Sequence, residues 1–188
     1  VNHGAVAALV ERLLPLDVPQ ARVPSVRRAM GPIAARFHGG PSGALTVFGV
    51  TGTNGKTTVT YLLEAIGQQA GHVSGVIGTT GAHVGAAEAD VGFTTPEAPE
   101  LQALLAWMRD AGARLVAVEV SSHALSMHRV DGTRFAVSCF TNFSQDHLDL
   151  HGSLEDYFEA KARLFTPELT GTGVVNADDE MGARLAAR

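Results

Sequence analysis

The stretch "ALTVFGVTGTNGKTT", residues 44–58, decides how the rest of the chain is interpreted. Residues 44–50 are almost continuously apolar, which is typical of a buried strand, and a helical pattern begins at Lys56. Between them, Gly52 and Gly55 allow backbone N–H groups to approach an anion at the amino end of the following helix. A strand, a glycine-rich loop and a helix in this order predict a phosphate-binding loop.

The polar side chains of this loop suit the same purpose. Lys56 supplies a cation for phosphate oxygens, and Thr57 offers a hydroxyl to Mg²⁺. The strict phosphate-loop pattern has a glycine five residues before Gly55, where this chain has Val50. A chance glycine-rich turn is the alternative, and the strand and the helix on either side argue against it.

Outward from the loop, strand-like and helix-like segments alternate. Apolar runs predict further strands at 72–78, 114–120, 135–140 and 171–177. Helical periodicity predicts helices at 26–37, 56–71, 99–112, 153–165 and 179–188. Ser153 and Asp156 have the spacing of a capping box at the start of one of these helices. Apolar strands separated by helices predict a three-layer α/β fold, with a mostly parallel sheet covered by helices on both faces.

The first 43 residues differ from this pattern. Residues 5–14 predict a short helix, and the Gly/Pro/Ser-rich segment 38–43 predicts a domain boundary. Residues 1–43 are too short for a domain, so we expect them to be the end of a preceding one. Residues 44–188 then form the second unit.

Composition limits the classes of function. The formal charge is −5 and there are no Lys/Arg runs, which argues against a nucleic-acid-binding surface. A single cysteine excludes an internal disulfide framework. The sequence has neither a basic, apolar leader nor an apolar run of membrane-spanning length, so a cytoplasmic protein that does not bind membranes is expected.

Residues that directly follow strands are the first candidates for a site, because ligands of such folds bind beyond the carboxyl ends of the strands. Glu119 ends the strand 114–120, where a buried carboxylate needs a cation partner. A structural salt bridge would satisfy it, but beside a phosphate loop we favour Mg²⁺. His147 follows the strand 135–140 and offers an imidazole ligand, flanked by Asp146 and Asp149. His128 and His151 are interpreted as surface residues.

Lysine is scarce in this chain. It has twelve arginines and only two lysines, Lys56 and Lys161. An ordinary surface lysine beside Glu159 and Arg163 is one interpretation of Lys161. The other is a carbamate, which a lysine amine forms with CO₂ and which is an anionic oxygen ligand for Mg²⁺ that arginine cannot provide.

Four ordered motifs carry a family resemblance. "GVTGTNGKTT" (49–58), "TTPEA" (94–98), "EVSSHALSMHRV" (119–130), and "TNFSQDHLDLHG" (141–152) followed by "YFEAKARLF" (157–165) resemble the ATP-dependent Mur ligases of peptidoglycan synthesis. They are most similar to the branch that adds the third residue of the stem peptide. The resemblance implies that 44–188 is most of the central ATP-binding domain and that 1–43 is the end of the uridine-nucleotide-binding domain with its linker. It also implies that the family's C-terminal domain lies outside this sequence.

The resemblance assigns roles to individual residues. Those matching the ATP phosphate loop are Gly52, Thr53, Asn54, Gly55, Lys56, Thr57 and Thr58. Those matching Mg²⁺ ligands are Thr57, Glu119, His147 and Lys161 as a carbamate, and of these His147 and Lys161, with Lys56, are the expected catalytic residues. Those matching substrate contacts are Thr94, Thr95, Ser121 and Arg129. Met127 departs from the family, whose better-known members have glutamine there.

The implied activity is amide-bond formation that consumes ATP in the presence of Mg²⁺. The implied substrates are UDP-MurNAc-L-Ala-D-Glu and an amino acid, with meso-diaminopimelate favoured over L-lysine. The alternatives are another Mur ligase, a folylpolyglutamate synthetase, a P-loop kinase or GTPase, and a non-catalytic nucleotide-binding fragment. We expect a monomer, and little or no turnover by these 188 residues alone.

Overall fold

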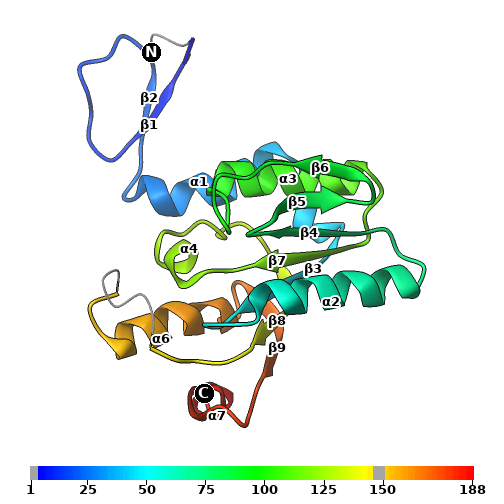
Figure 1. The fold of residues 1–188 in the computed structure, drawn as a ribbon. Helices are drawn as coiled ribbons and strands as arrows, with labels where there is room; N and C mark the ends of the chain where they lie inside the picture. Colours follow the sequence, from blue (N-terminus) through cyan, green and yellow to red (C-terminus); the bar gives the residue numbers. More distant parts are fainter. Residues whose placement is uncertain (1–3, 146–150) are drawn as a thin grey trace.

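The computed structural model describes residues 4–145 and 151–188, whose largest feature is a seven-stranded sheet (Figure 1). The strands run across the sheet in the order β6-β5-β4-β7-β3-β8-β9. Their bounds are Thr46–Thr51 (β3), Ser74–Gly78 (β4), Gly81–Val84 (β5), Ala87–Ala89 (β6), Leu115–Glu119 (β7), Phe135–Phe140 (β8) and Thr170–Val175 (β9). The five strands from β4 to β9 in this order are parallel, which confirms the predicted mostly parallel sheet.

Helices connect the parallel strands, as predicted. Their bounds are Lys56–Gln69 (α2), Ala98–Asp110 (α3), Ser122–Ser126 (α4), Leu154–Ala162 (α6) and Glu180–Ala186 (α7), with a 3-10 turn at Arg163–Phe165. The short helix α4 was not predicted from the sequence. Ser153 caps α6 by accepting a hydrogen bond from the Asp156 N–H, at 3.1 Å. Its hydroxyl also donates to the Asp156 carboxylate, so the capping box is only partly formed.

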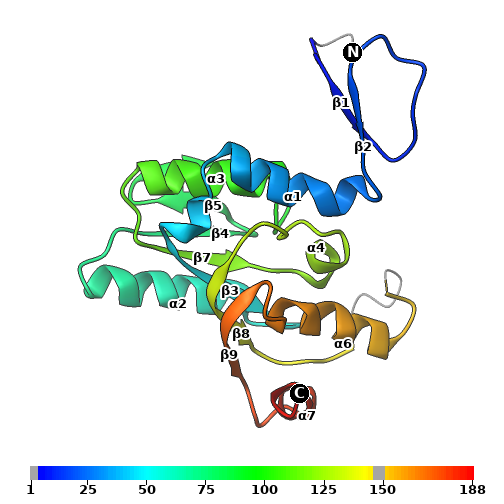
Figure 2. The same ribbon diagram turned by 180° about the vertical axis from the view of Figure 1, so that it is seen from behind.

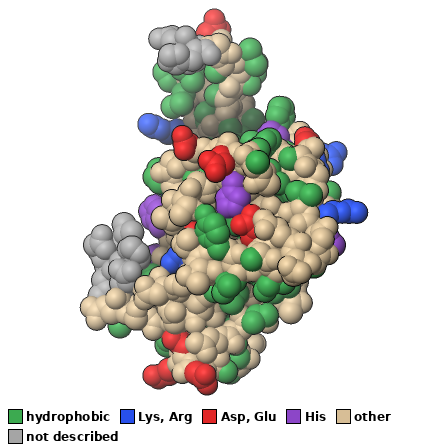
Figure 3. Space-filling view, turned by 45° about the vertical axis from the view of Figure 1, so that its right-hand side comes forward, with side chains coloured by type: hydrophobic (Ala, Val, Ile, Leu, Met, Phe, Trp, Pro, Cys, Tyr) green, Lys and Arg blue, Asp and Glu red, His purple; other side chains and the backbone are tan. Residues whose placement is uncertain are grey.

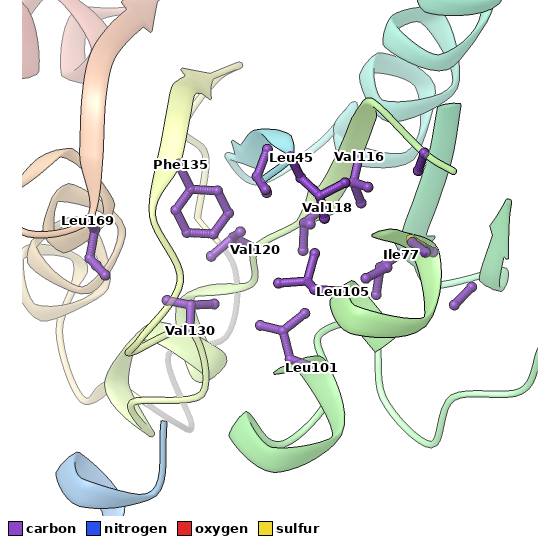
Figure 4. Packing of buried hydrophobic residues seen from close by; sticks show 14 of the residues in the cluster. Leu45, Ile77, Leu101, Leu105, Val116, Val118, Val120, Val130, Phe135 and Leu169 are labelled. Atoms are coloured by element: carbon purple, nitrogen blue, oxygen red, sulfur yellow. The ribbon is translucent and has the colours of Figure 1, made fainter. Parts of the chain in front are cut away.

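The two faces of the sheet are covered by different helices. On β7, Val116 and Val118 pack in one buried cluster with Leu101 and Leu105 of α3 (Figure 4). Leu115 points to the opposite face, because side chains alternate along a strand, and it approaches α2 at Gly67. Helices therefore cover both faces, which confirms the three-layer α/β architecture.

The hairpin β5–β6 extends the sheet with two antiparallel strands. It was not predicted, although its sequence carries a signal. Gly85, between the two strands, has a φ of 57°, a conformation that a two-residue hairpin turn requires and that glycine adopts without strain.

The predicted helix at 5–14 is wrong. Residues Ala8–Val10 form strand β1, which pairs in parallel with β2, Gln20–Arg22 (Figures 1 and 2). The apolar residues of this segment do not share a buried helical face, since Val6 is 83% exposed and Leu13 is 69% exposed. Helix propensity is a weak preference, and here pairing with residues twelve positions further along the chain outweighs it.

Helix α1, Val26–Phe37, has the predicted bounds and lies against α3 (Figure 2). It also packs closely on the loop that follows α4. A Cβ atom added at Gly31 would lie 1.9 Å from the carbonyl oxygen of Asp131, so no side chain fits there. The contact makes α1 part of the same packed unit as the large sheet.

The charged side chains are scattered on the side of the surface seen in Figure 3. Among the described residues of that face, Lys and Arg side chains lie apart from one another and form no continuous basic surface. In the described ranges 4–145 and 151–188, none of the helices has both the length and the apolar character needed to cross a membrane.

Candidate active site

The phosphate-loop residues lie between β3 and α2, as predicted. Gly52 has a φ of 141° and Gly55, the residue before α2, has a φ of 84°, so both adopt conformations that favour glycine. A Cβ atom at Gly52 would lie 2.0 Å from the Thr141 hydroxyl oxygen. The loop can therefore follow this path only with glycine at position 52.

Residues after β8 hold the loop in place. The Asn54 N–H donates to Asn142 Oδ1 at 2.9 Å, and the Thr141 hydroxyl donates to the Asn54 carbonyl at 2.6 Å. The Ser144 N–H donates to the Thr53 hydroxyl at 3.0 Å. These bracing residues were not singled out from the sequence, although the polar segment that begins at 141 was recognised.

Lys56, the predicted phosphate-binding cation, contacts the backbone of the loop before it. Its Nζ donates to the carbonyl oxygens of Gly52, at 3.0 Å, and Thr53, at 2.9 Å. Thr57 and Thr58 follow in the first turn of α2, where backbone N–H groups have no partner within the helix. A lysine charge and a helix amino terminus at one point suit a bound polyphosphate.

Glu119 is buried at the carboxyl end of β7, where it is 1% exposed. One carboxylate oxygen accepts the Thr79 N–H at 3.0 Å, and the other accepts the Thr79 hydroxyl at 3.2 Å. Within the described part of the chain, Glu119 has no cation within ion-pair distance. A buried carboxylate in this state has the capacity to ligate a metal ion, and carboxylate oxygens are ligands that Mg²⁺ prefers.

Lys161 lies at the same loop, although it comes from α6. It is 1% exposed, and its Nζ donates to the Gly52 carbonyl at 2.8 Å. The Tyr157 ring lies beneath it, with the Nζ 4.4 Å from the ring centroid. The interpretation of Lys161 as an ordinary surface lysine is therefore wrong. His147, with Asp146 and Asp149, lies outside the described residues, so its predicted role stays a prediction.

The predicted substrate residues meet in a second part of the site. Thr94, Thr95, Ser121 and Arg129 line a pocket of about 200 Å³ that is completed by Phe93, Ser122 and His123. Thr95 links its two walls, because its hydroxyl accepts the Ser121 N–H at 3.1 Å and donates to the Glu119 carbonyl at 2.8 Å. The pocket is thus fixed directly to the strand that carries Glu119.

The two histidines that were interpreted as surface residues have specific contacts. His151 is half-buried, with its Nε2 3.0 Å from the Ser122 hydroxyl and its ring tilted against that of Tyr157, with the ring centroids 5.1 Å apart. His128 pairs with Asp131 at 2.8 Å, in a backbone conformation with a φ of 56°. Met127 ends α4 and does not line the pocket described above.

The single cysteine is not suited to be a nucleophile. Cys139 lies on β8, and burial raises the pKa of its thiol above the ordinary value. The thiolate is the reactive form, so this thiol is largely unreactive at neutral pH. The site therefore offers cations and hydrogen-bond donors for anions and no thiol nucleophile.

Comparison with known proteins identifies the family of the chain. The family described as "Mur ligase middle domain" matches residues 50–188. A ligase of Corynebacterium glutamicum named UDP-N-acetylmuramoyl-L-alanyl-D-glutamate–2,6-diaminopimelate ligase is 50% identical over 172 residues, which cover 90% of this chain and 33% of that protein. The chain spans between 33% and 38% of the length of three such curated relatives.

Solved structures agree. The structure of a ligase with the same name has a TM-score of 0.88 and 34% identity, and covers 99% of this chain and 38% of that one. A folylpolyglutamate synthase/dihydrofolate synthase with Mn, AMPPNP and L-glutamate bound has a TM-score of 0.63 at 21% identity, over 85% of this chain and 45% of that one, which shows a shared fold alone. The chain belongs to the Mur ligase family, and its residues 50–188 are that family's middle domain.

Proposed function

We propose that this chain is part of an ATP-dependent amide ligase of peptidoglycan precursor synthesis. The enzyme adds meso-diaminopimelate to the D-glutamate of UDP-MurNAc-L-Ala-D-Glu. The observation that carries the proposal is that Glu119 ends the strand next to the one that leads into the phosphate loop, and its carbonyl is hydrogen-bonded to Thr95 in a pocket with a buried arginine, Arg129. Lys161 is hydrogen-bonded to the same loop. A site of this kind brings a polyphosphate and a carboxylate together. The names of the relatives support the choice of substrates.

The proposed reaction has two steps. The substrate carboxylate attacks the γ-phosphorus of ATP, which gives an acyl phosphate and releases ADP. The amine of the amino acid then attacks the acyl carbon, the C–O bond to phosphate breaks, the nitrogen loses a proton, and an amide and inorganic phosphate remain.

The main task of the chain is to align two anions that repel each other. Lys56 and the N–H groups of the loop would hold the triphosphate, and Arg129 would hold the acidic substrate in its pocket. Thr57, Glu119, His147 and a carbamate on Lys161 would hold Mg²⁺, which supplies further charge neutralisation when it is bound. A site concentrated in this way explains how a chain with a formal charge of −5 binds polyanions.

The proposal includes domain organisation and cellular location. Residues 1–43 would be the end of a uridine-nucleotide-binding domain with its linker, and 44–188 most of the central domain. The relatives are about three times as long as the matched region, which leaves room for further domains in the full chain. A cytoplasmic, monomeric enzyme fits substrates that are nucleotides and nucleotide-linked precursors.

The test is an assay of the full chain that carries this sequence. We expect ADP release that requires UDP-MurNAc-L-Ala-D-Glu together with meso-diaminopimelate, and a tripeptide product of the corresponding mass. L-Lysine in place of diaminopimelate is the matched control for the amino acid. ADP release that does not require the muramoyl substrate would contradict the proposal. Amide formation on a folate substrate would also contradict it.

A further inference from the structure

A charged cluster joins helix α1 to the wall of the candidate substrate pocket. Glu97 Oε2 accepts a hydrogen bond from Arg27 Nη1 at 2.5 Å, and Glu97 Oε1 lies 3.0 Å from Arg129 Nη2. The Arg129 side chain is 7% exposed and lines the pocket, whereas the Arg27 side chain is 41% exposed. Two guanidinium groups and one carboxylate leave one net positive charge at this edge of the pocket.

The position of Glu97 in its helix does not explain why a glutamate is present. Glu97 is the N-cap residue of α3, yet its side chain makes no capping hydrogen bond. Serine, threonine, aspartate or asparagine would stabilise the helix start better than a residue whose side chain makes no capping hydrogen bond. The longer glutamate side chain instead reaches two arginines that come from different elements.

The Arg129 guanidinium is fixed from several sides. Its Nη1 donates to the Thr95 carbonyl at 3.2 Å, and its Cζ lies 4.5 Å from the centroid of the Phe93 ring. Its Nε is buried without a hydrogen-bond partner among the described residues. Glu97 provides the one carboxylate contact of this buried cation in the described chain, so it balances the charge and sets the plane of the guanidinium.

We propose that Glu97 is a positioning residue for the anionic part of the UDP-linked substrate. It orients Arg129 in the pocket wall, and it holds Arg27 at the pocket edge as a second guanidinium for carboxylate or phosphate oxygens. Arg27 acts only while Glu97 holds it, because its exposed side chain is otherwise free to turn into solvent. The inference rests on the proposed function and adds two residues to its substrate site.

The test compares four variants of the full chain: Glu97→Gln, Glu97→Asp, Arg27→Gln and the double variant Glu97→Gln/Arg27→Gln. We expect Glu97→Gln to raise the KM for UDP-MurNAc-L-Ala-D-Glu about tenfold, the usual effect of losing one charge-assisted contact. The KM for ATP and kcat should stay within about twofold, since the phosphate loop is untouched. Glu97→Asp should recover part of the loss. Arg27→Gln should raise the same KM by about threefold.

The double variant is the sharpest comparison. If Arg27 acts through Glu97, the double variant has the KM of Glu97→Gln alone. Glu100→Gln is the matched control, because Glu100 lies in the first turn of the same helix and takes no part in an ion pair or side-chain hydrogen bond among the described residues. It should leave both KM values unchanged.

A second experiment distinguishes the two anionic groups of the substrate that the arginines could bind, the diphosphate and the glutamate carboxylates. UDP-MurNAc-L-Ala, which lacks the D-glutamate, is used as a competitive inhibitor. An inhibition constant that rises in Glu97→Gln upholds the proposal and assigns the diphosphate. An unchanged inhibition constant with a raised KM for the full substrate upholds it and assigns the glutamate carboxylates.

Three results would overturn the inference. They are an unchanged KM in a folded Glu97→Gln variant, an equal rise in the KM for ATP, and effects of Glu97→Gln and Arg27→Gln that multiply independently. Thermal unfolding of each variant shows whether it is folded. If Glu97→Gln does not fold, the KM values of Glu97→Asp are compared with those of the wild type instead, and an unchanged KM for the UDP-linked substrate then overturns the inference. A wild-type chain without ligase activity would instead contradict the proposed function.

Discussion

At the scale of single residues, Lys161 is one of only two lysines in the sequence, and its amine lies buried at the phosphate loop. A buried lysine is costly unless its amine has partners, and here the amine is bonded to the phosphate-loop carbonyl of Gly52 and lies over Tyr157. The Lys56 amine donates to the same carbonyl. The only two lysines of the chain therefore meet at one backbone oxygen.

The proposed carbamate on Lys161 can be tested by chemical rescue. We expect Lys161→Ala in the full chain to lower ligase activity by about 10²-fold or more, because a charged ligand is lost, and short carboxylates in the assay to restore part of it. Lys56→Ala is the matched control, since it removes a cation and carboxylates cannot replace it. A folded Lys161→Ala variant with wild-type activity and no response to carboxylates would refute the carbamate.

At the scale of elements, the turn from β3 into α2 is the most constrained connection in the site. Gly52 lies against the Thr141 hydroxyl and the backbone of Asn142, both of which belong to the segment after β8. The phosphate loop after β3 is thus packed against the segment after β8. These two strands are neighbours in the sheet and distant in the sequence.

Alanine substitutions at two glycines distinguish a loss of stability caused by close packing from one caused by backbone conformation. We expect Gly52→Ala to lower the free energy of unfolding by about 2–4 kcal/mol and to abolish ATP binding, because its Cβ has no space. Gly71→Ala is the matched control: Gly71 also has a positive φ, 81°, but open space around it, so a loss of only about 1 kcal/mol is expected. Urea unfolding and nucleotide titration measure both. Equal losses in the two variants would show that packing against Thr141 is unimportant.

The elements also show what could be predicted from the sequence. Continuous apolar runs identified the five parallel strands of the large sheet, because strands buried on both faces are apolar throughout. Polar residues at the ends of these strands indicated Glu119 and the segment at 141, because ligands of such folds bind beyond the carboxyl ends of the strands. The strand pair β1–β2 was missed, since three-residue strands depend on pairing rather than on local pattern. The Arg27–Glu97 contact was missed because it joins residues 70 positions apart, and nothing in either local sequence indicates the other.

At the scale of the whole molecule, the sheet collects residues from distant segments at one end. Glu119 ends β7, Lys56 and Thr141 come after the adjacent strands β3 and β8, and Lys161 comes from α6. Helix α1 joins this assembly through Gly31 and Arg27. A segment expected to belong to a preceding domain is therefore linked, through Glu97, to Arg129 of the candidate substrate pocket.

The length of the relatives leads to a prediction for residues 1–188 on their own. Because the chain spans only about a third of those proteins, we expect no amide formation by this stretch alone with ATP, UDP-MurNAc-L-Ala-D-Glu and diaminopimelate. Product detection by mass spectrometry, with the full chain as control, measures this. Amide formed by residues 1–188 alone would show that they contain the complete catalytic apparatus.

The most direct test of the central claim is a crystal structure of the full chain with a non-hydrolysable ATP analogue, Mg²⁺ and UDP-MurNAc-L-Ala-D-Glu. We expect the phosphates on the N–H groups of residues 52–58, with the Lys56 amine moved from the Gly52 and Thr53 carbonyls onto phosphate oxygens. We also expect Mg²⁺ on Thr57 and Glu119, and an acidic group of the substrate on Arg129. A nucleotide bound elsewhere, or a muramoyl substrate that does not contact the pocket of Thr94, Thr95, Ser121 and Arg129, would contradict it.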